Sequence, residues 1–314
     1  MNQLRIVFMG TPEFAVPSLE VLVNNKFNVV AVITAPDKPQ GRGQKLGASP
    51  VKECALKYNI PVLQPTNLKS QQFLEELKSY NANLQIVVAF RMLPEAVWAM
   101  PSLGTFNLHA SLLPQYRGAA PINWAIINGE KETGVTTFFL QHQIDTGSII
   151  LQEKEPIHYH DDVGSVYDRL MNKGAQLVLR TVRSIEIGNH PSIPQNETQP
   201  IKHAPKIFKE TCAINWNQPS ERVYDFVRGL SPYPGAWSII NSKSYKIFKC
   251  SPQQASSGQS TTGSEAVDVQ QHYKTDNKSY LYMKTSDGWI SIEEFQPEGK
   301  KRMTVEEFFR GNKL

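Results

Sequence analysis

Three side chains that can support acid–base and hydrogen-bond chemistry stand near the ends of two apolar segments. Asn107 and His109 lie two positions apart in the run 105–109, so a strand would point the amide and the imidazole to the same side. A second β-branched and aromatic run, residues 135–140, is followed by Asp145. Ligands of open α/β sheets bind at the carboxyl ends of strands. An amide donor, a titratable base and a carboxylate at such an edge favour acyl or one-carbon transfer, with an oxyanion donor, a general base and an orienting group.

Each of these side chains also has a structural interpretation. An isolated Asn at the end of a strand is commonly a turn former, and an isolated His commonly makes a structural hydrogen bond. The tripeptide from Asp145 to Gly147 is a turn signature as well. The spacing alone therefore leaves open whether the three side chains meet.

Apolar and helical segments alternate through the first part of the chain, which predicts an α/β fold with a parallel sheet of Rossmann type. The first strand-to-helix turn, residues 10–15, lacks the second and third glycines of the dinucleotide fingerprint. No P-loop motif is present either, so we expect no nucleotide cofactor. The expected strands are residues 4–9, 27–34, 62–63, 84–89 and 105–109, and the expected helices are residues 13–23, 50–58, 71–80, 95–100, 120–128 and 165–187.

The last third of the chain has short strand-like runs separated by turns, which predicts a small β-barrel. Four prolines and little apolar periodicity make residues 190–205 an expected linker, stiff and extended. This linker would join a first domain, residues 1–189, to a second domain, residues 206–314. Within the second domain we expect a helix at 222–230, strands at 236–240, 245–250, 279–284 and 289–295, and a capping box from Thr304 to Glu307 before a terminal helix.

Composition fits a globular protein of one or two domains. Of the 314 residues, 40% are hydrophobic and 20% are charged, and no apolar run approaches the ~20 residues that span a bilayer. The chain enters a strand at Leu4 with no basic leader before it, so we expect a cytoplasmic protein. We also expect no membrane partner and a monomer. The cysteines at positions 54, 212 and 250 form no ligand or disulfide pattern, and we expect reduced thiols and no metal.

Basic residues are unevenly distributed along the chain. Residues 1–200 carry 17 basic and 17 acidic side chains, so the net charge of +4 belongs to residues 201–314. The loop of residues 35–50 is long for a βα connection and rich in Pro and Gly. It contains Lys38, Arg42 and Lys45 with no acid after position 37. This pattern predicts an arm that binds phosphate and becomes ordered on RNA.

Two motifs surround the candidate residues. The first runs Asn107-Leu-His109-Ala-Ser111-Leu-Leu-Pro114 and continues Arg117-Gly-Ala-Ala-Pro121, and the second comprises Gly134-Val-Thr-Thr and Ile144-Asp145-Thr-Gly147. Both motifs resemble the signatures of folate-dependent formyltransferases. The residues of the first motif resemble those of the methionyl-tRNA formyltransferases in particular. The resemblance covers essentially the whole chain. Phe90-Arg91 departs from the family pattern, which has Tyr-Gly at this place.

The resemblance implies substrates and roles for residues. It implies 10-formyltetrahydrofolate as co-substrate, methionyl-initiator tRNA as acceptor, and Asn107, His109 and Asp145 as catalytic residues. It implies a C-terminal domain similar to an OB-fold. It further implies a folate-facing wall made of Ser111, Leu112, Leu113 and Pro114, and tRNA contacts from the basic loop, above all Arg42, and from Lys206 and Lys209.

Other functions remain open from the residues themselves. A formyltransferase for glycinamide ribonucleotide or an amino sugar nucleotide would share the catalytic set. A formyltetrahydrofolate hydrolase would use water as the acceptor, and a non-catalytic RNA-binding protein is a third alternative. The basic loop and the basic last third favour an RNA acceptor, whose affinity should fall steeply with ionic strength.

Overall fold

The computed structural model describes residues 3–40, 45–253 and 272–314, which form two compact units. Unit 1 contains Met1–Pro121, Glu132–Pro156 and Tyr167–Ala204. Unit 2 contains Ile122–Lys131, Ile157–Val166 and Pro205–Leu314. These units differ from the expected domains, residues 1–189 and 206–314. The difference arises because two inner segments, residues 122–131 and 157–166, pack with the C-terminal part of the chain.

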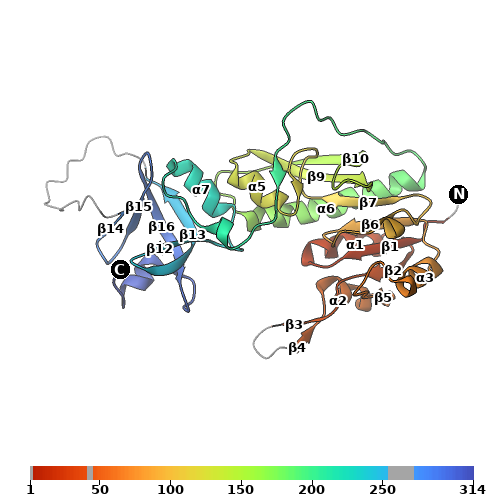
Figure 1. Cartoon of the computed structure of the whole chain (residues 1–314), viewed down its shortest axis with the longest axis horizontal. Helices are drawn as coiled ribbons and strands as arrows, with labels where there is room; N and C mark the ends of the chain where they lie inside the picture. Colours follow the sequence, from red (N-terminus) through yellow and green to blue (C-terminus); the bar gives the residue numbers. More distant parts are fainter. Residues whose placement is uncertain (1–2, 41–44, 254–271) are drawn as a thin grey trace. The chain divides into compact units, whose positions relative to one another are not determined.

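Unit 1 is built on a seven-stranded sheet in the order β10-β9-β7-β6-β1-β2-β5 (Figure 1). The five strands from β7 to β5 run parallel, as the alternation of apolar and helical segments predicts. The last two strands add an antiparallel edge to the sheet. The strands are β1 Ile6–Gly10, β2 Val29–Ile33, β5 Val62–Leu63, β6 Leu84–Val88, β7 Thr105–His109, β9 Glu132–Phe139 and β10 Ile149–Pro156.

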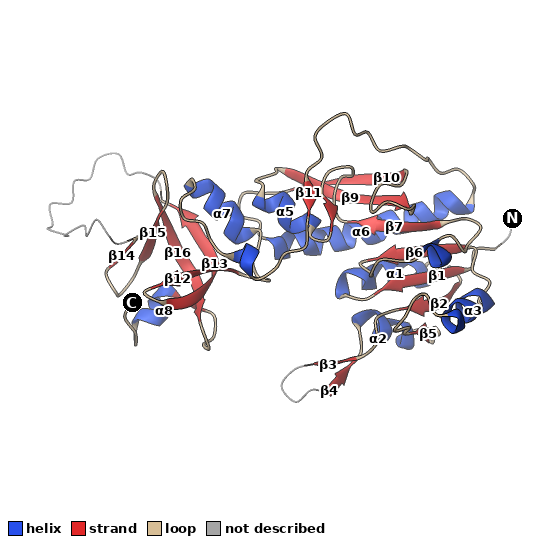
Figure 2. Cartoon of the chain, in the orientation of Figure 1, coloured by secondary structure: helices blue, strands red, loops and turns tan. Residues whose placement is uncertain are grey.

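The helices of unit 1 begin and pack for local reasons. Ser49 and Ser70 cap two of them, since each hydroxyl accepts a hydrogen bond from a backbone N–H three residues on. Phe73 and Leu77, four positions apart on one helix, are both buried against the sheet core. The helical elements are η1 Glu13–Ala15, α1 Val16–Asn24, α2 Pro50–Lys57, α3 Gln71–Ser79, α4 Glu95–Trp98 and most of α6, Val163–Glu186 (Figure 2).

Strand β7 has one face against α6 and the other toward the carboxyl-edge loops. Leu108 is 3% exposed and packs on α6 at Gly174, where a Cβ would lie 2.7 Å from the Leu108 Cδ2 atom. Side chains alternate along a strand, so Asn107 and His109 point away from α6. The glycine therefore lets the helix approach the back of the strand that carries the candidate residues.

Residues 189–204, which we call the strap, lead from the end of α6 back over unit 1. Ile193 pairs with Ile149 at the start of β10. At the other end β11, His203–Ala204, pairs in parallel with β8, Arg117–Gly118. Gly118 is required there, because its φ is +126° and a Cβ would come 2.4 Å from the Ala204 carbonyl oxygen. The strap is part of unit 1 and is bonded to the rest of it at both ends and between them.

Unit 2 contains an antiparallel sheet in the order β12-β13-β16-β15-β14, with β17 paired to β16. Its core includes Tyr245, Phe295 and Phe308, whose rings touch one another. The capping box of Thr304 and Glu307 is confirmed. Among the described helices, none combines the length and apolar character that crossing a membrane requires. The elements are β12 Ala236–Ile240, β13 Lys243–Pro252, β14 Tyr273–Thr275, β15 Leu281–Lys284, β16 Trp289–Pro297, β17 Met303–Thr304, η2 Glu210–Cys212, α5 Pro121–Ile127, α7 Ser220–Arg228 and α8 Val305–Phe309.

A buried ion pair on α7 holds one inner segment of unit 2, residues 157–166, to that helix. Arg228 and Asp225 are 5% and 8% exposed, and the guanidinium Nη2 lies 2.6 Å from the carboxylate. The same guanidinium donates through Nη1 to the carbonyl oxygens of His158 and Asp161, at 3.2 and 2.9 Å. One arginine thus joins α7 to residues 157–166, a segment that is distant from it in sequence.

Replacing Arg228 with methionine should destabilise unit 2 by about 3–5 kcal/mol, because the Asp225 carboxylate is then left buried without its cation. Chemical denaturation followed by tryptophan fluorescence measures this loss. The control is Lys57→Met, which removes the exposed pair with Glu20 and should cost under about 1 kcal/mol. Equal losses in the two variants would show that the buried pair has no special structural role.

Candidate active site

The amide and the imidazole predicted from the sequence share one face of β7. Asn107 pairs with Val87 of β6 and with Phe138 of β9, and His109 is the last residue of the strand. Asn107 is the one partly exposed residue of this otherwise buried strand. Its carboxamide makes no hydrogen bond with any other residue in the described part of the chain.

The imidazole of His109 has its two nitrogens in different surroundings. Nε2 lies 2.9 Å from the Tyr116 carbonyl oxygen. A carbonyl only accepts hydrogen bonds, so Nε2 carries the proton. In the neutral ring Nδ1 is then the basic nitrogen, and it lies 3.9 Å from Asp145 Oδ2. The ring is 6% exposed and edge-on to Phe138, so its orientation is set by packing as well as by the carbonyl.

Asp145 lies in the loop between β9 and β10 and reaches back to β7. Its Oδ2 accepts a hydrogen bond of 3.0 Å from the Gly118 N–H. Its φ is +55°, an uncommon value for a residue with a side chain, although aspartate tolerates it better than most. The structure therefore brings Asp145 to His109, and Asn107 lies on the same strand face.

The four residues expected to face folate follow β7 directly, and several of their polar atoms bond within the protein. Ser111 is fully buried, and its hydroxyl donates to the Gln115 carbonyl at 2.6 Å. Thr136 donates to the Ser111 carbonyl at 2.6 Å and accepts from the Leu113 N–H at 3.2 Å. Leu113 is 3% exposed. These bonds fix the course of residues 111–114, while a folate contact for Ser111, Leu112, Leu113 and Pro114 stays a prediction.

The neighbouring loop, after β6, carries the departure from the family pattern. The Arg91 guanidinium donates to the carbonyl oxygens of Pro65 and Thr66 in the loop after β5. It also lies 5.7 Å from the centre of the Phe90 ring. Arg91 is thus anchored away from β7 by bonds to backbone that the sequence pattern could not reveal.

The loop after β2 is held by hydrogen bonds that involve Lys52 and Gln64. Lys52 donates to Asp37 at 2.5 Å and to Gln64 at 2.8 Å, and Gln64 donates to the other oxygen of Asp37. The hydrogen bonds from Lys52 and Gln64 lower the pKa of the Asp37 carboxyl. The base of the basic loop therefore has a fixed anchor on the sheet.

The residues expected to bind tRNA are distributed over both units. Lys38 is exposed on β3, Lys38–Gln40, which pairs with β4, Lys45–Gly47, so the predicted loop begins and ends as a hairpin. Arg42 lies outside the described residues, as does the side chain of Lys45. In unit 2 Lys206 is exposed, with its ammonium 5.4 Å from the centre of the Phe208 ring.

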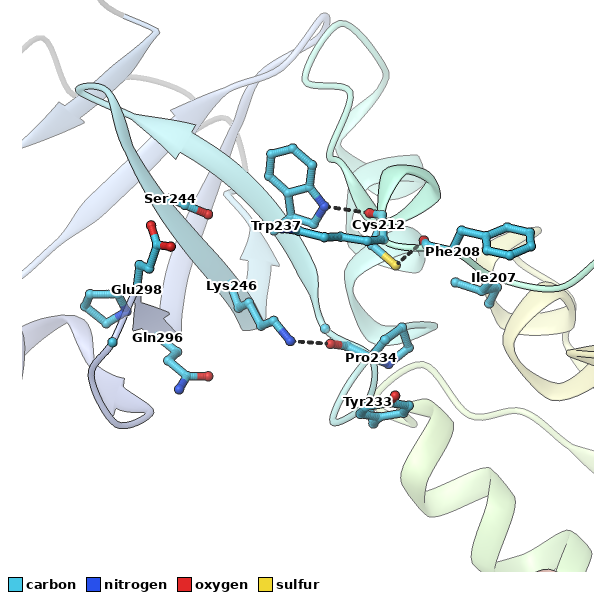
Figure 3. A pocket seen from close by; sticks show the side chains of 14 residues that line it. Ile207, Phe208, Cys212, Tyr233, Pro234, Trp237, Ser244, Lys246, Gln296 and Glu298 are labelled. Carbon is cyan, nitrogen blue, oxygen red and sulfur yellow. Dashed lines mark hydrogen bonds between the residues drawn. The ribbon is translucent and has the colours of Figure 1, made fainter. Parts of the chain in front are cut away.

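Lys209 borders a cavity of about 520 Å³ in unit 2 (Figure 3). Its carbonyl accepts a 2.8 Å hydrogen bond from the Trp237 indole. Lys246 and Tyr233 also line this cavity. Lys246 donates to the Pro234 carbonyl at 2.9 Å, and Tyr233 is 80% exposed. Glu298 also lines the cavity, so its charged side chains are of both signs.

The three cysteines of the sequence all lie within the described residues. Cys54, Cys212 and Cys250 are buried and unpaired, as expected. Burial raises the pKa of the Cys54 thiol to about 11. Searching the described residues finds no group of His, Cys, Asp and Glu side chains that could hold a metal ion.

Two family models and many curated proteins are similar to the chain. The model described as Formyl transferase matches residues 4–182, and the model described as Formyl transferase, C-terminal domain, matches residues 206–313. The methionyl-tRNA formyltransferase of Bacteroides fragilis is 54% identical over 318 residues, which cover 99% of this chain and 95% of the relative. That of Flavobacterium johnsoniae is 50% identical over 315 residues, which cover 99% and 97%.

Solved structures share the fold at lower identity. WlaRD, a sugar 3N-formyl transferase, matches with a TM-score of 0.67 and 22% identity over 96% of this chain and 100% of its own. HypX from Aquifex aeolicus, in complex with tetrahydrofolic acid, matches with a TM-score of 0.64 and 19% identity over 99% of this chain. The chain spans about half of HypX, 48%. The relatives that are half identical over nearly the full length decide the assignment, and it agrees with the resemblance read from the motifs: the chain belongs to the methionyl-tRNA formyltransferase family, the enzymes that transfer a formyl group to methionyl-tRNA.

Proposed function

We propose that Asn107, His109 and Asp145 carry out the transfer of the formyl group from 10-formyltetrahydrofolate to the α-amino group of methionyl-initiator tRNA. The observation that supports this most directly is that the two nitrogens of the His109 ring face different partners. Nε2 is occupied by the Tyr116 carbonyl at 2.9 Å, and Nδ1 faces Asp145 at 3.9 Å. A base held in one tautomer beside a carboxylate, next to a free carboxamide on the same strand face, suits acyl transfer.

In the first step the neutral amine attacks the formyl carbon, a C–N bond forms, and the carbonyl electron pair moves to oxygen. The Asn107 carboxamide donates a hydrogen bond to that oxyanion, and this stabilises the tetrahedral intermediate. His109 accepts the proton that the attacking nitrogen loses. The charge that develops on the imidazole is stabilised by the Asp145 carboxylate.

In the second step the bond between the formyl carbon and N10 of the folate breaks. The oxyanion electron pair re-forms the carbonyl, and His109 returns its proton to N10, which leaves as the amine of tetrahydrofolate. Protons and electrons balance within the two substrates and one imidazole. The folate lies against residues 111–114, which lead directly away from His109.

Binding of tRNA is assigned to the basic loop and to the start of the C-terminal unit. Lys38, Arg42 and Lys45 form an arm that approaches phosphate, and Lys206 and Lys209 add contacts from unit 2. This assignment is supported by the exposure of Lys38, Lys206 and Lys209. The protein acts as a monomer in the cytoplasm, where initiator tRNA is charged.

Formyl transfer measured with charged initiator tRNA, with uncharged tRNA and with water alone tests the proposal. We expect rapid transfer only to the charged tRNA, and tRNA affinity that falls steeply between 50 and 200 mM salt. The Arg42→Ala variant should bind tRNA more weakly, with a salt slope reduced by about 1 and folate affinity unchanged.

Three outcomes would contradict this assignment. Transfer to water at the same rate would indicate a hydrolase. Transfer to an amino sugar nucleotide but not to tRNA would indicate a different acceptor. A matched loss of folate affinity in Arg42→Ala would contradict the role given to the arm, and Lys26→Ala, a basic side chain on another loop, serves as the control.

A further inference from the structure

One side chain of the strap enters the candidate active site. Between residues 191 and 200 every side chain is exposed except that of Gln195, which is partly buried. The amide of a glutamine needs hydrogen-bond partners when it is removed from water. Gln195 makes four hydrogen bonds to three residues.

The amide nitrogen of Gln195 holds the loop that carries Asp145. Nε2 donates to the Asp145 carbonyl at 2.8 Å and to the Gly147 carbonyl at 2.9 Å. Both hydrogens of the amide are used, and both reach the backbone on either side of Thr146. The Asp145 backbone has a positive φ of 55°, a conformation that persists when surrounding bonds determine it.

The amide oxygen of Gln195 holds the opposite side of the site. Oε1 accepts from Arg117 Nε at 3.1 Å and from Nη2 at 2.6 Å. The two residues that flank Arg117 each make one hydrogen bond, one to His109 and one to Asp145. Tyr116 supplies the carbonyl that holds His109, and Gly118 supplies the N–H that holds the Asp145 carboxylate.

A single amide therefore spans the two backbone segments whose separation sets the geometry of the imidazole and the carboxylate. We propose that Gln195 is a positioning residue, which keeps Asp145 Oδ2 at its 3.9 Å distance from His109 Nδ1. Gln195 touches neither of these side-chain atoms, and it acts through the carbonyls and through Arg117. The inference rests on the catalytic roles proposed above for His109 and Asp145.

Two variants distinguish the role of the amide nitrogen of Gln195 from that of its amide oxygen. Gln195→Met has similar length and removes all four bonds. Gln195→Glu still accepts from Arg117, now as an ion pair, but its carboxylate cannot donate to the two carbonyls. Because a displacement of about 1 Å costs up to about 100-fold in rate, we expect both variants to lose 10- to 100-fold in kcat, with KM for each substrate little changed.

The matched control is Gln141→Met. Gln141 is exposed and donates to the Thr146 hydroxyl at 2.7 Å in the same loop, but it touches no carbonyl beside Asp145. We expect it to keep the wild-type kcat. A thermal melt of each variant checks that the fold is intact.

A double-mutant cycle with Asp145→Asn tests whether Gln195 acts through the carboxylate. If it does, Gln195→Met should have little additional effect in the Asp145→Asn background, since coupled residues are not additive. Wild-type kcat in Gln195→Glu, or full additivity in the cycle, would overturn the inference. Failure of the catalytic assignment itself has a different signature, because Asp145→Asn alone would then retain activity.

Discussion

Replacing His109 with alanine is expected to lower kcat for formyl transfer by about 100- to 10,000-fold, the range that general acid–base catalysis contributes. The expected loss is large because, in the proposed mechanism, one ring serves both steps, removing the proton from the attacking amine and returning it to the leaving nitrogen. Its Nε2 is already bonded to the Tyr116 carbonyl, which leaves Nδ1 as the nitrogen that exchanges the proton. Single-turnover transfer to charged tRNA at saturating folate measures this step.

The His109→Gln variant separates chemistry from structure. A glutamine amide can donate to the Tyr116 carbonyl, but it cannot carry a proton between the two nitrogens. We expect His109→Gln to be nearly as slow as His109→Ala while unfolding at a temperature closer to the wild type. His142, 74% exposed in its side chain, provides the control: His142→Ala should transfer normally. A His109→Gln variant with wild-type turnover would remove the imidazole from the mechanism.

The second large effect is expected at Asn107. The Asn107→Ala variant should lose about 100- to 1,000-fold in kcat, the effect of removing one oxyanion donor. An interaction made only in the transition state lowers kcat and kcat/KM together, so KM for the folate should stay close to its original value. Steady-state kinetics over a range of formyl-donor concentrations distinguishes this result from a loss of binding.

Asn107→Asp sharpens the test of the oxyanion donor. The aspartate has the same shape but no N–H to donate, and its negative charge would repel the oxyanion. We expect it to be at least as slow as the alanine variant. Within the described residues Asn107 makes no side-chain hydrogen bond, so Asn107→Ala should change the free energy of unfolding little, whereas Asn107→Asp should lower it more because it places a charge at a partly buried position. A rise in KM with kcat preserved would instead make Asn107 a binding residue.

Local sequence patterns correctly predicted the strand that carries Asn107 and His109. Strand β7 spans residues 105–109 and β12 spans residues 236–240, as expected from their apolar runs. The placement of Asn107 and His109 on one face follows from the two-residue period of a strand. The partner strands β9 and β10 run antiparallel, and β10 escaped prediction because its second half, Gln152–Glu155, is polar.

Contacts between distant segments were beyond the reach of local patterns. Asp145 meets His109 because Gly118 binds its carboxylate, and no spacing rule joins residues 27 positions apart. Arg91 donates hydrogen bonds to the carbonyl oxygens of residues 65 and 66. No periodicity in the sequence predicts this contact. Gln195 stands in a run that composition marks as a linker, and only its burial among exposed neighbours distinguishes it.

The course of the strap has a practical consequence for anyone who wishes to excise the catalytic half of the molecule. The end of α6 at Glu186 looks like a natural place to cut, since the prolines that follow resemble a tether. A fragment ended there would lose both β11 and the amide that braces the Asp145 loop. A fragment that continues through Ala204 would retain them, but residues 122–131 and 157–166 would still lose the C-terminal residues against which they pack.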